Sequence, residues 1–403
     1  MNTLAEKFRT MVAKDPRQKE ASFDVMYPTG FLALDFLNGT VVHVNDENNS
    51  KYYSVGITDG TSVTFIGRSG SGKTTLAIQA GANIIRPFEK GVMFIDDIEG
   101  GSLGARRSVL TKFGADECNR IIYRNESITA ENVFERIDQI YKMKLENRVE
   151  FEYDTGKVDP NGNKIYKLVP TVYLIDSLAM LTPESLTEEE KLSGQMSATA
   201  MAKVNTQVFK RIVPKLKAAN ILLFTINHIN DKVEINPFAK TQAQVSYLKP
   251  GETLPGGKAA IYLANNMFRL DDSTKLKESE GMGIHGKIVD VTIVKSRSSS
   301  GGKSVPLVFD SITGFDEKLS LLYFLKTVGE ISAKGAYMSF KDYPDVKFTQ
   351  KGFLDKLDKD EEFRNIFEDA AKKRLVELIS SNYNYISYDQ DDYDPNRGIL
   401  DSL

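Results

Sequence analysis

The chain has 403 residues and a formal net charge of −3, from 52 Lys and Arg against 55 Asp and Glu residues. This length accommodates one large core and a smaller domain. The slightly acidic balance excludes nucleic-acid binding through overall positive charge, so any such site must be local. Cys118 is the only cysteine and the three histidines are far apart in sequence. An intrachain disulfide is therefore excluded, and a metal site built from Cys or His is disfavoured.

The N-terminus carries no signal-peptide pattern, and nowhere do about 18 apolar residues run together. We therefore expect a soluble intracellular protein without a membrane segment. Residues 3–14 form a short predicted helix with one apolar face, made by Leu4, Phe8, Met11 and Val12. This apolar face has to be buried, either against a neighbouring subunit or against the chain's own domain. We assign residues 1–27 to an N-terminal oligomerisation segment.

Residues 67–74 read G-R-S-G-S-G-K-T and match the phosphate-loop pattern G-x-x-x-x-G-K-[ST]. The apolar run 62–66 before the loop predicts a buried strand, and residues 75–80 after it predict a helix. Glycines let successive N–H groups converge on a phosphate at a helix N-terminus, where Lys73 adds a point charge and Thr74 offers a hydroxyl to Mg²⁺. The predicted nucleotide-binding residues are Gly67, Arg68, Ser69, Gly70, Ser71, Gly72, Lys73, Thr74 and Thr75.

Apolar strands and helices alternate after the phosphate loop, which predicts an α/β fold with a mainly parallel sheet covered on both faces. The expected strands are 92–96, 120–123, 171–176, 221–226, 267–270 and 289–294, and the expected helices include 131–145 and 200–217. Residues 150–168 predict an inserted, exposed hairpin. We expect the main domain over 28–316, a small C-terminal α+β domain over 317–382 with a strong helix at 363–379, and a tail over 383–403.

The tail carries five aspartates against one arginine and is predicted to be disordered. It either serves as a solubilising end or lies on a basic groove until nucleic acid displaces it. The sequence leaves these two alternatives equally open.

Carboxylates follow two of the predicted strands, at the sheet edge where open parallel sheets bind ligands. Asp176 ends one strand and, with Thr74, is the predicted Mg²⁺ ligand. Asp96, Asp97 and Glu99 follow another strand. ATP hydrolysis needs a carboxylate that orients and deprotonates water, for which Glu99 is the first choice and Asp97 the second. The alternative is a solvated acidic turn without a catalytic role.

Asn227 and His228 follow the next strand, where a polar pair could sense the γ-phosphate and affect the loop that follows. That loop, 229–259, is long and rich in basic and amide groups, which suit contacts to a nucleic-acid backbone and bases. The alternative is an ordinary mobile insertion. Cations at the end of the last long strand, Lys295 and Arg297, could reach into a neighbouring subunit's nucleotide.

Together these motifs resemble the RecA family of homologous-recombination ATPases, and especially the phage UvsX-type recombinases. The resemblance covers about residues 28–316 and is carried by segments 67–74, 94–99, 174–179, 226–228, 256–259 and 294–297. It implies a RecA-like P-loop NTPase core with a mainly parallel twisted sheet, a short N-terminal helix and a small C-terminal α+β domain. The spacing from Asp96 to Glu99 exceeds the family's D-x-E pattern by one residue, and the 150–168 hairpin has no counterpart.

The resemblance also implies residue roles. Lys73 and Glu99 would act in catalysis, His228 would be the γ-phosphate switch, and Lys295 and Arg297 would reach the neighbouring ATP across a filament interface. The first DNA loop would fall near 182–199 with Met196 as a wedge between base triplets, and the second across 229–259. The predicted nucleic-acid-binding residues are Met196, Lys240, Gln242, Lys249, Gly256, Gly257 and Lys258.

We therefore expect a DNA-dependent ATPase that uses ATP and Mg²⁺, forms helical filaments on single-stranded DNA and catalyses pairing and strand exchange with duplex DNA. Further expected partners are single-strand-binding and loader proteins. A phage-encoded protein of this type would act in the cytoplasm of a bacterial host. Two alternatives remain from the sequence: a hexameric DNA helicase on the same core, and an ATP-gated scaffold that coats DNA.

Overall fold

The structure, a computed structural model, describes residues 23–46, 48, 50–102, 104–106, 111–125, 128–184, 194–231, 248–255, 263–275, 286–299 and 301–380. The side chains of residues 194–205 and 275 lie outside the description. The predicted N-terminal helix and the acidic tail also lie outside the described residues. No helix in the described part of the chain is both long and apolar enough to cross a membrane.

One large sheet organises the described chain. Its strands are β5 (Ser62–Gly67), β6 (Val92–Asp97), β7 (Ile121–Arg124), β10 (Thr171–Asp176), β11 (Ile221–His228), β14 (Asn266–Lys275), β15 (Gly286–Ser296), β16 (Ser304–Asp310) and β17 (Gly314–Asp316). These nine strands lie in the order β17-β16-β15-β14-β5-β11-β10-β6-β7. The six strands from β14 to β7 pair in parallel, whereas β15, β16 and β17 extend the sheet antiparallel. The predicted α/β fold with a mainly parallel sheet is confirmed.

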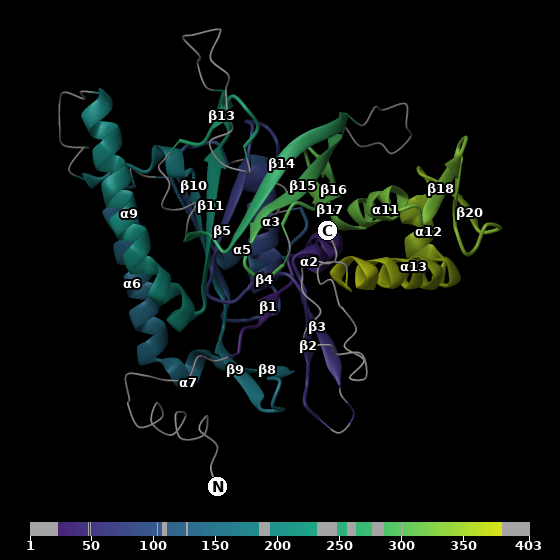
Figure 1. Ribbon diagram of the computed structural model, residues 1–403, viewed down its shortest axis with the longest axis horizontal. Helices are drawn as coiled ribbons and strands as arrows, with labels where there is room; N and C mark the ends of the chain where they lie inside the picture. The colour runs from purple at the N-terminus through teal and green to yellow at the C-terminus, as the bar shows by residue number, and fades with distance from the viewer. Residues whose placement is uncertain are drawn as a thin grey trace, which may run out of the picture.

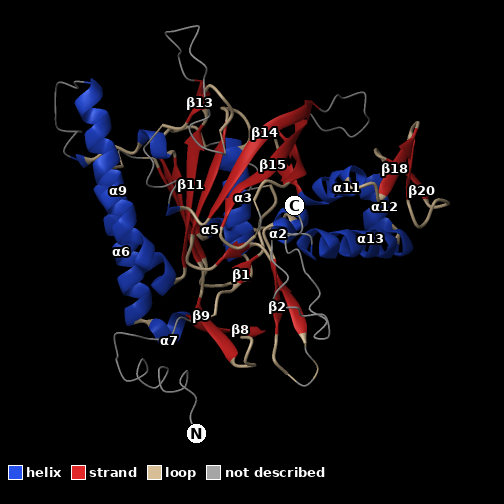
Figure 2. Ribbon diagram, viewed as in Figure 1, coloured by secondary structure: helices blue, strands red, loops and turns tan. Residues whose placement is uncertain are grey.

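Helices cover both faces of the sheet (Figures 1 and 2): α3 (Lys73–Ile85) lies on one face, and α6 (Ala130–Glu146) and α9 (Gly194–Ala219) lie side by side on the other. The side chains of β10 alternate between two apolar clusters, one on each face of the sheet. Val172 and Leu174 join the cluster that contains α3, whereas Tyr173 and Ile175 join the cluster of α6 and α9. Both faces of β10 are buried, as expected for a strand that reads as a continuous apolar run.

The C-terminal region packs against the main domain through a shared apolar core. It comprises α11 (Glu317–Thr327), a small antiparallel sheet of β18 (Ile331–Lys334), β19 (Tyr337–Phe340) and β20 (Lys347–Thr349), α12 (Phe353–Lys359) and α13 (Glu361–Ser380). Phe363 and Phe367 of α13 belong to the same buried cluster as Phe31 and Leu34, which flank and form α2 (Leu32–Leu37). The α+β composition matches the prediction, and the contact with α2 holds the region to the core.

Short antiparallel strand pairs lie at the end of the sheet away from the phosphate loop. They are β1 (Met26–Tyr27) with β4 (Ile57–Thr58), β2 (Thr40–His43) with β3 (Lys51–Ser54), and β8 (Glu152–Val158) with β9 (Lys164–Leu168), next to α7 (Arg148–Phe151); α5 (Ala115–Asn119) precedes β7. The predicted hairpin is present, but its prediction as exposed is only partly right. The ammonium of Lys167 is buried 2.7 Å from Asp59 Oδ2, and the hydroxyls of Tyr153 and Tyr27 lie 2.9 Å apart.

A buried lysine fastens α6 to the sheet. The Lys144 ammonium donates hydrogen bonds to the carbonyl oxygens of Val169 (2.6 Å) and Asn220 (3.4 Å) and to Thr171 Oγ1 (3.2 Å). Only 1% of the residue is exposed. Burial disfavours the charged form and lowers the pKa of Lys144 to about 7.

The buried Lys144 predicts a pH-dependent stability. Between about pH 7 and the ordinary lysine pKa of 10.5, the unfolded chain binds a proton at this site and the native chain does not. The free energy of unfolding therefore rises with pH across this window, and the rise is absent from Lys144→Met. Urea unfolding of both proteins at several pH values measures the difference, and a constant difference would contradict the assignment.

Candidate functional site

The parallel register brings the sequence-predicted motifs to one edge of the sheet. In the ladders, Gly67 pairs with His228, and Asp97 pairs with Asp176. The phosphate loop, the acidic turn after β6, Asp176 and His228 therefore leave the sheet at the same end. This edge is the C-terminal edge of the strands, where ligands of open α/β sheets bind.

The glycines of the phosphate loop meet specific steric demands. Gly70 and Gly72 have φ angles of +75° and +89°, which L-residues with a side chain rarely adopt. A Cβ atom on Gly72 would lie 2.8 Å from the Phe315 ring, and one on Gly67 would lie 2.6 Å from the Leu270 carbonyl oxygen. A residue with a side chain at any of these positions would strain the loop.

Lys73 begins α3 and turns its ammonium back over the loop. Its Nζ donates to the Arg68 carbonyl oxygen at 2.7 Å, and the Ser71 N–H donates to the same oxygen at 3.2 Å. Burial lowers the pKa of Lys73 to about 8, although the charges of Asp176 and Glu99 oppose the shift. Two donors thus converge on one oxygen, an arrangement that also suits a phosphate oxygen.

Thr74 and Asp176 form the pair predicted to bind Mg²⁺. Thr74 Oγ1 donates to Asp176 Oδ2 at 2.7 Å, and burial raises the pKa of Asp176 to about 6. Asp176 Oδ1 is buried without a hydrogen-bond partner among the described residues. A buried carboxylate oxygen without a partner is costly, and oxygen donors are what Mg²⁺ prefers. These two side chains therefore fit the ion.

The two carboxylates that end β6 have different surroundings. Asp96 is fully buried, with its Oδ1 3.1 Å from Arg124 Nε and 3.1 Å from Arg136 Nη1. Asp97 is also buried and accepts hydrogen bonds from the N–H groups of Gly100 (2.9 Å) and Ser102 (3.0 Å) and from the Tyr123 hydroxyl. Burial acts to raise the pKa of Asp97, but these hydrogen bonds outweigh it and lower the pKa. Asp96 therefore pairs with cations of β7 and α6, whereas Asp97 holds the turn that follows β6.

Glu99 instead faces the phosphate-loop edge. Its Oε1 accepts a hydrogen bond from Ser177 Oγ at 2.7 Å and lies 3.0 Å from His228 Nε2. Ligand atoms of Glu99, Asp176 and His228 all lie within 4.8 Å of one another. Of Asp96, Asp97 and Glu99, it is Glu99 that the structure groups with Asp176 and His228.

The phosphate-loop edge is connected to the foot of the predicted second DNA loop, where β12 (Asn230–Asp231) pairs with β13 (Glu252–Thr253). Asn227 Nδ2 donates to the Pro255 carbonyl oxygen at 2.7 Å. Arg68, a predicted nucleotide contact, instead forms an exposed ion pair with Asp231 at 2.6 Å. The buried Arg269 of β14 holds Glu252 with hydrogen bonds of 2.6 and 2.9 Å.

Two of the predicted DNA contacts, Lys249 and Met196, lie among the described residues. Lys249 is described: its N–H donates to Glu252 at 2.8 Å and its side chain is 66% exposed. Met196 lies on α9, but its side chain is outside the description. The others lie outside the described residues: Lys240, Gln242, Gly256, Gly257 and Lys258.

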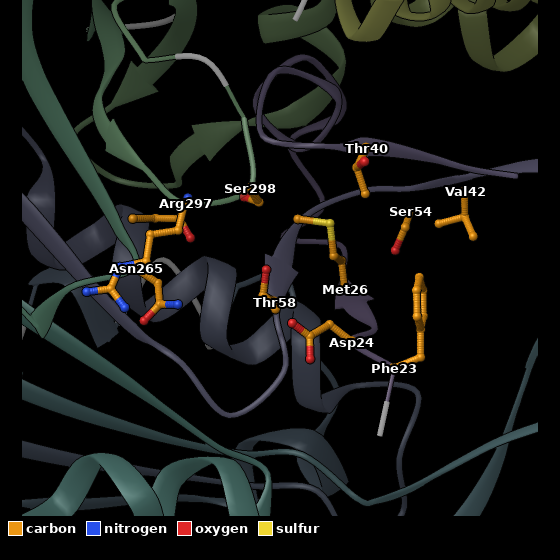
Figure 3. A pocket seen from close by; sticks show the side chains of 11 residues that line it. Phe23, Asp24, Met26, Thr40, Val42, Ser54, Thr58, Asn265, Arg297 and Ser298 are labelled. Carbon is orange, nitrogen blue, oxygen red and sulfur yellow. The ribbon is translucent and has the colours of Figure 1, made fainter. Parts of the chain in front are cut away.

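Lys295 and Arg297 are not part of this cluster. Ser296 pairs with Asn266, the first residue of β14, so both cations lie at the sheet edge opposite the phosphate loop. There Arg297 lines a cavity of about 230 Å³. Figure 3 shows Arg297 and Asn265 on one side of this cavity and Ser54 and Val42 on the other.

The structure adds side chains whose roles the sequence did not indicate. Ser177 holds Glu99, and Lys287 of β15 donates to the Gly70 carbonyl oxygen at 2.7 Å. A lone lysine at the start of a strand carries no motif, so only the packing of β15 beside the phosphate loop reveals it.

No protein-family model matches the chain. The chain is 25% identical over 331 residues to the protein RecA of Francisella philomiragia, covering 80% of this chain and 73% of that protein. It is 25% identical over 324 residues to the protein RecA of Acidothermus cellulolyticus, covering 80% and 76%. It is 23% identical over 346 residues to a plasmid protein RecA of Lactococcus lactis, covering 84% and 81%. These alignments do not test the closer resemblance to UvsX-type recombinases, which stays a prediction.

The different surroundings of Asp97 and Glu99 predict different effects of their substitution on the free energy of unfolding. Asp97→Asn places an amide among hydrogen-bond donors and is expected to lower the free energy of unfolding by about 1–3 kcal/mol. Glu99→Gln, the matched control, should change it by less than about 0.5 kcal/mol because Ser177 still has an acceptor. Urea unfolding without nucleotide provides the comparison, and equal losses in both variants would contradict it.

Proposed function

We propose that this chain, a RecA-family protein, is a DNA-dependent ATPase that forms helical filaments on single-stranded DNA and promotes homologous pairing and strand exchange. The observation that carries the proposal is the division of the predicted site between two edges of one sheet. Glu99, Asp176 and His228 gather beside the phosphate loop, whereas Lys295 and Arg297 lie at the opposite edge. Stacking of copies head to tail would bring the two groups together.

Nucleotide binding would use donors that now converge on the Arg68 carbonyl oxygen. A phosphate oxygen of ATP would accept from the Lys73 ammonium and from loop N–H groups, at the N-terminus of α3. Thr74 and Asp176 would hold Mg²⁺. Mg²⁺ held there would supply positive charge that offsets the negative charge of the phosphates.

Glu99 would orient the attacking water and accept its proton. Its carboxylate lies at the phosphate-loop edge and is held from two sides, by Ser177 and His228. Asp97 is less suited because its oxygens accept hydrogen bonds from the turn that follows. A positioned base of this kind typically contributes a rate factor of about 10²–10⁴.

His228 and Asn227 would link the γ-phosphate to DNA binding. His228 contacts Glu99, and the neighbouring Asn227 side chain holds the Pro255 carbonyl at the foot of the second loop. A shift of His228 toward a bound γ-phosphate would therefore move the segment next to this loop.

The DNA contacts belong to the same proposal. Basic and amide groups of the two loops would follow the phosphodiester backbone, and Met196 would separate stacked bases. The proposed residues are Met196, Lys240, Gln242, Lys249, Gly256, Gly257 and Lys258.

The first test is the ATPase rate with and without single-stranded DNA, with the same mixtures imaged by negative-stain electron microscopy. We expect strong stimulation by DNA and helical filaments, and loss of hydrolysis in Lys73→Ala because the phosphates lose their main point charge. Closed rings would favour a hexameric helicase. Turnover indifferent to DNA, or unaltered in Lys73→Ala, would remove the proposal. Strand exchange by the unaltered protein then separates a recombinase from a DNA-coating scaffold.

The divided site predicts complementation between two inactive proteins. Lys73→Ala lacks a working phosphate loop but keeps its cations, whereas Arg297→Ala keeps the loop but lacks one cation for its neighbour. In mixed filaments, some interfaces join an intact loop to an intact Arg297. We expect the mixture to hydrolyse ATP well above the sum of the separate proteins. Strictly additive rates would show that Arg297 does not act on a neighbouring subunit.

A further inference from the structure

Lys287 makes a contact with the phosphate loop for which the proposed function has no role. It lies near the start of β15, between β14 and β16. Its ammonium donates to the Gly70 carbonyl oxygen at 2.7 Å and to the Asp272 carboxylate at 2.7 Å. The side chain is 18% exposed and its ammonium lies 5.7 Å from the centre of the Phe309 ring.

The hydrogen bond to Gly70 orients a peptide unit of the loop. In a planar trans peptide, the carbonyl of Gly70 and the N–H of Ser71 point in opposite directions. The Ser71 N–H points to the Arg68 carbonyl oxygen, the same oxygen that binds the Lys73 ammonium. Lys287 therefore holds the carbonyl on one side of the loop while the N–H faces the proposed phosphate position on the other.

Packing does little to fix this peptide. Gly70 adopts a φ angle of +75°, and apart from its two chain neighbours no described residue comes within 4 Å of the position that its Cβ atom would occupy. A glycine without neighbours has many accessible conformations, so ordering it on ligand binding costs free energy. A charged hydrogen bond to its carbonyl reduces this cost in advance.

The charge of Lys287 also affects the site directly. Its ammonium lies 2.7 Å from a carbonyl oxygen of the loop, which places positive potential there. Asp272, the acidic partner of Lys287, is 55% exposed and partly cancels this potential.

We propose that Lys287 is a positioning residue that preorganises the phosphate loop, by holding the Gly70 carbonyl, and adds positive potential for the polyphosphate of the nucleotide. Asp272 moderates this charge. The inference rests on the proposed nucleotide-binding function of the same site. It distinguishes Lys287 from a structural ion pair, in which both partners would matter equally.

The test measures the affinity of the full chain for a fluorescent ATP analogue with Mg²⁺. Lys287→Met removes a charged hydrogen bond and should weaken binding about tenfold. Lys287→Arg keeps the charge and a donor and should restore most of the affinity. Lys318→Met is the matched control, because it removes another 2.7 Å Lys–Asp ion pair, on α11, and should bind as the unaltered protein does.

The Asp272→Asn variant distinguishes a positioning role of Lys287 from a role in a structural ion pair. It removes negative charge near the phosphates and leaves Lys287 on Gly70, so binding should be unchanged or tighter. Weakening equal to that of Lys287→Met would overturn the inference in favour of a structural pair, as would an unaltered affinity in Lys287→Met. If Lys287→Met does not fold, the affinities of Lys287→Arg and Asp272→Asn decide. Failure of the unaltered protein to bind nucleotide would instead refute the proposed function.

Discussion

Parallel pairing of β5, β11, β10 and β6 is the constraint on which the candidate site depends. Parallel strands leave the sheet at one edge, so motifs separated by as many as 161 positions, such as Gly67 and His228, become neighbours. The apolar faces enforce this register, because a slip by one residue would turn every core side chain of β10 to the opposite face. The geometry of Glu99, Asp176 and His228 therefore follows from core packing as much as from their own hydrogen bonds.

The site holds buried charges that its own groups only partly balance. Burial shifts the pKa of Lys73 down and that of Asp176 up, so each group is less stable in its charged form than it would be in water. A polyphosphate with a divalent cation would bring both missing partners at once. Such a site lowers the free energy of unfolding of the ligand-free protein and raises its affinity for the ligand.

The contacts between the phosphate-loop edge and the foot of the predicted second DNA loop differ in strength. Arg68 and Asp231 form an exposed ion pair, which is worth little in water. Arg269 and Glu252 form a buried pair with two hydrogen bonds, which fixes where the loop begins. The buried Arg269–Glu252 pair holds β13 in place, whereas the Arg68–Asp231 pair is weak. A bound nucleotide would therefore displace Arg68 without moving the foot of the predicted second DNA loop.

The sequence by itself determined the phosphate loop, the alternating elements and the strand-end carboxylates, because these depend on local spacing and apolar periodicity. It ranked Glu99 before Asp97, but it did not indicate that the oxygens of Asp97 accept hydrogen bonds from the turn whereas Glu99 is held by Ser177. It did not indicate Lys287, whose role exists only where β15 passes the loop. Tertiary structure also decided that the inner face of the predicted hairpin is buried and that Arg297 lies at the far edge. Side-chain partners and the antiparallel direction of β15 depend on contacts between distant segments, which the local pattern of the sequence does not encode.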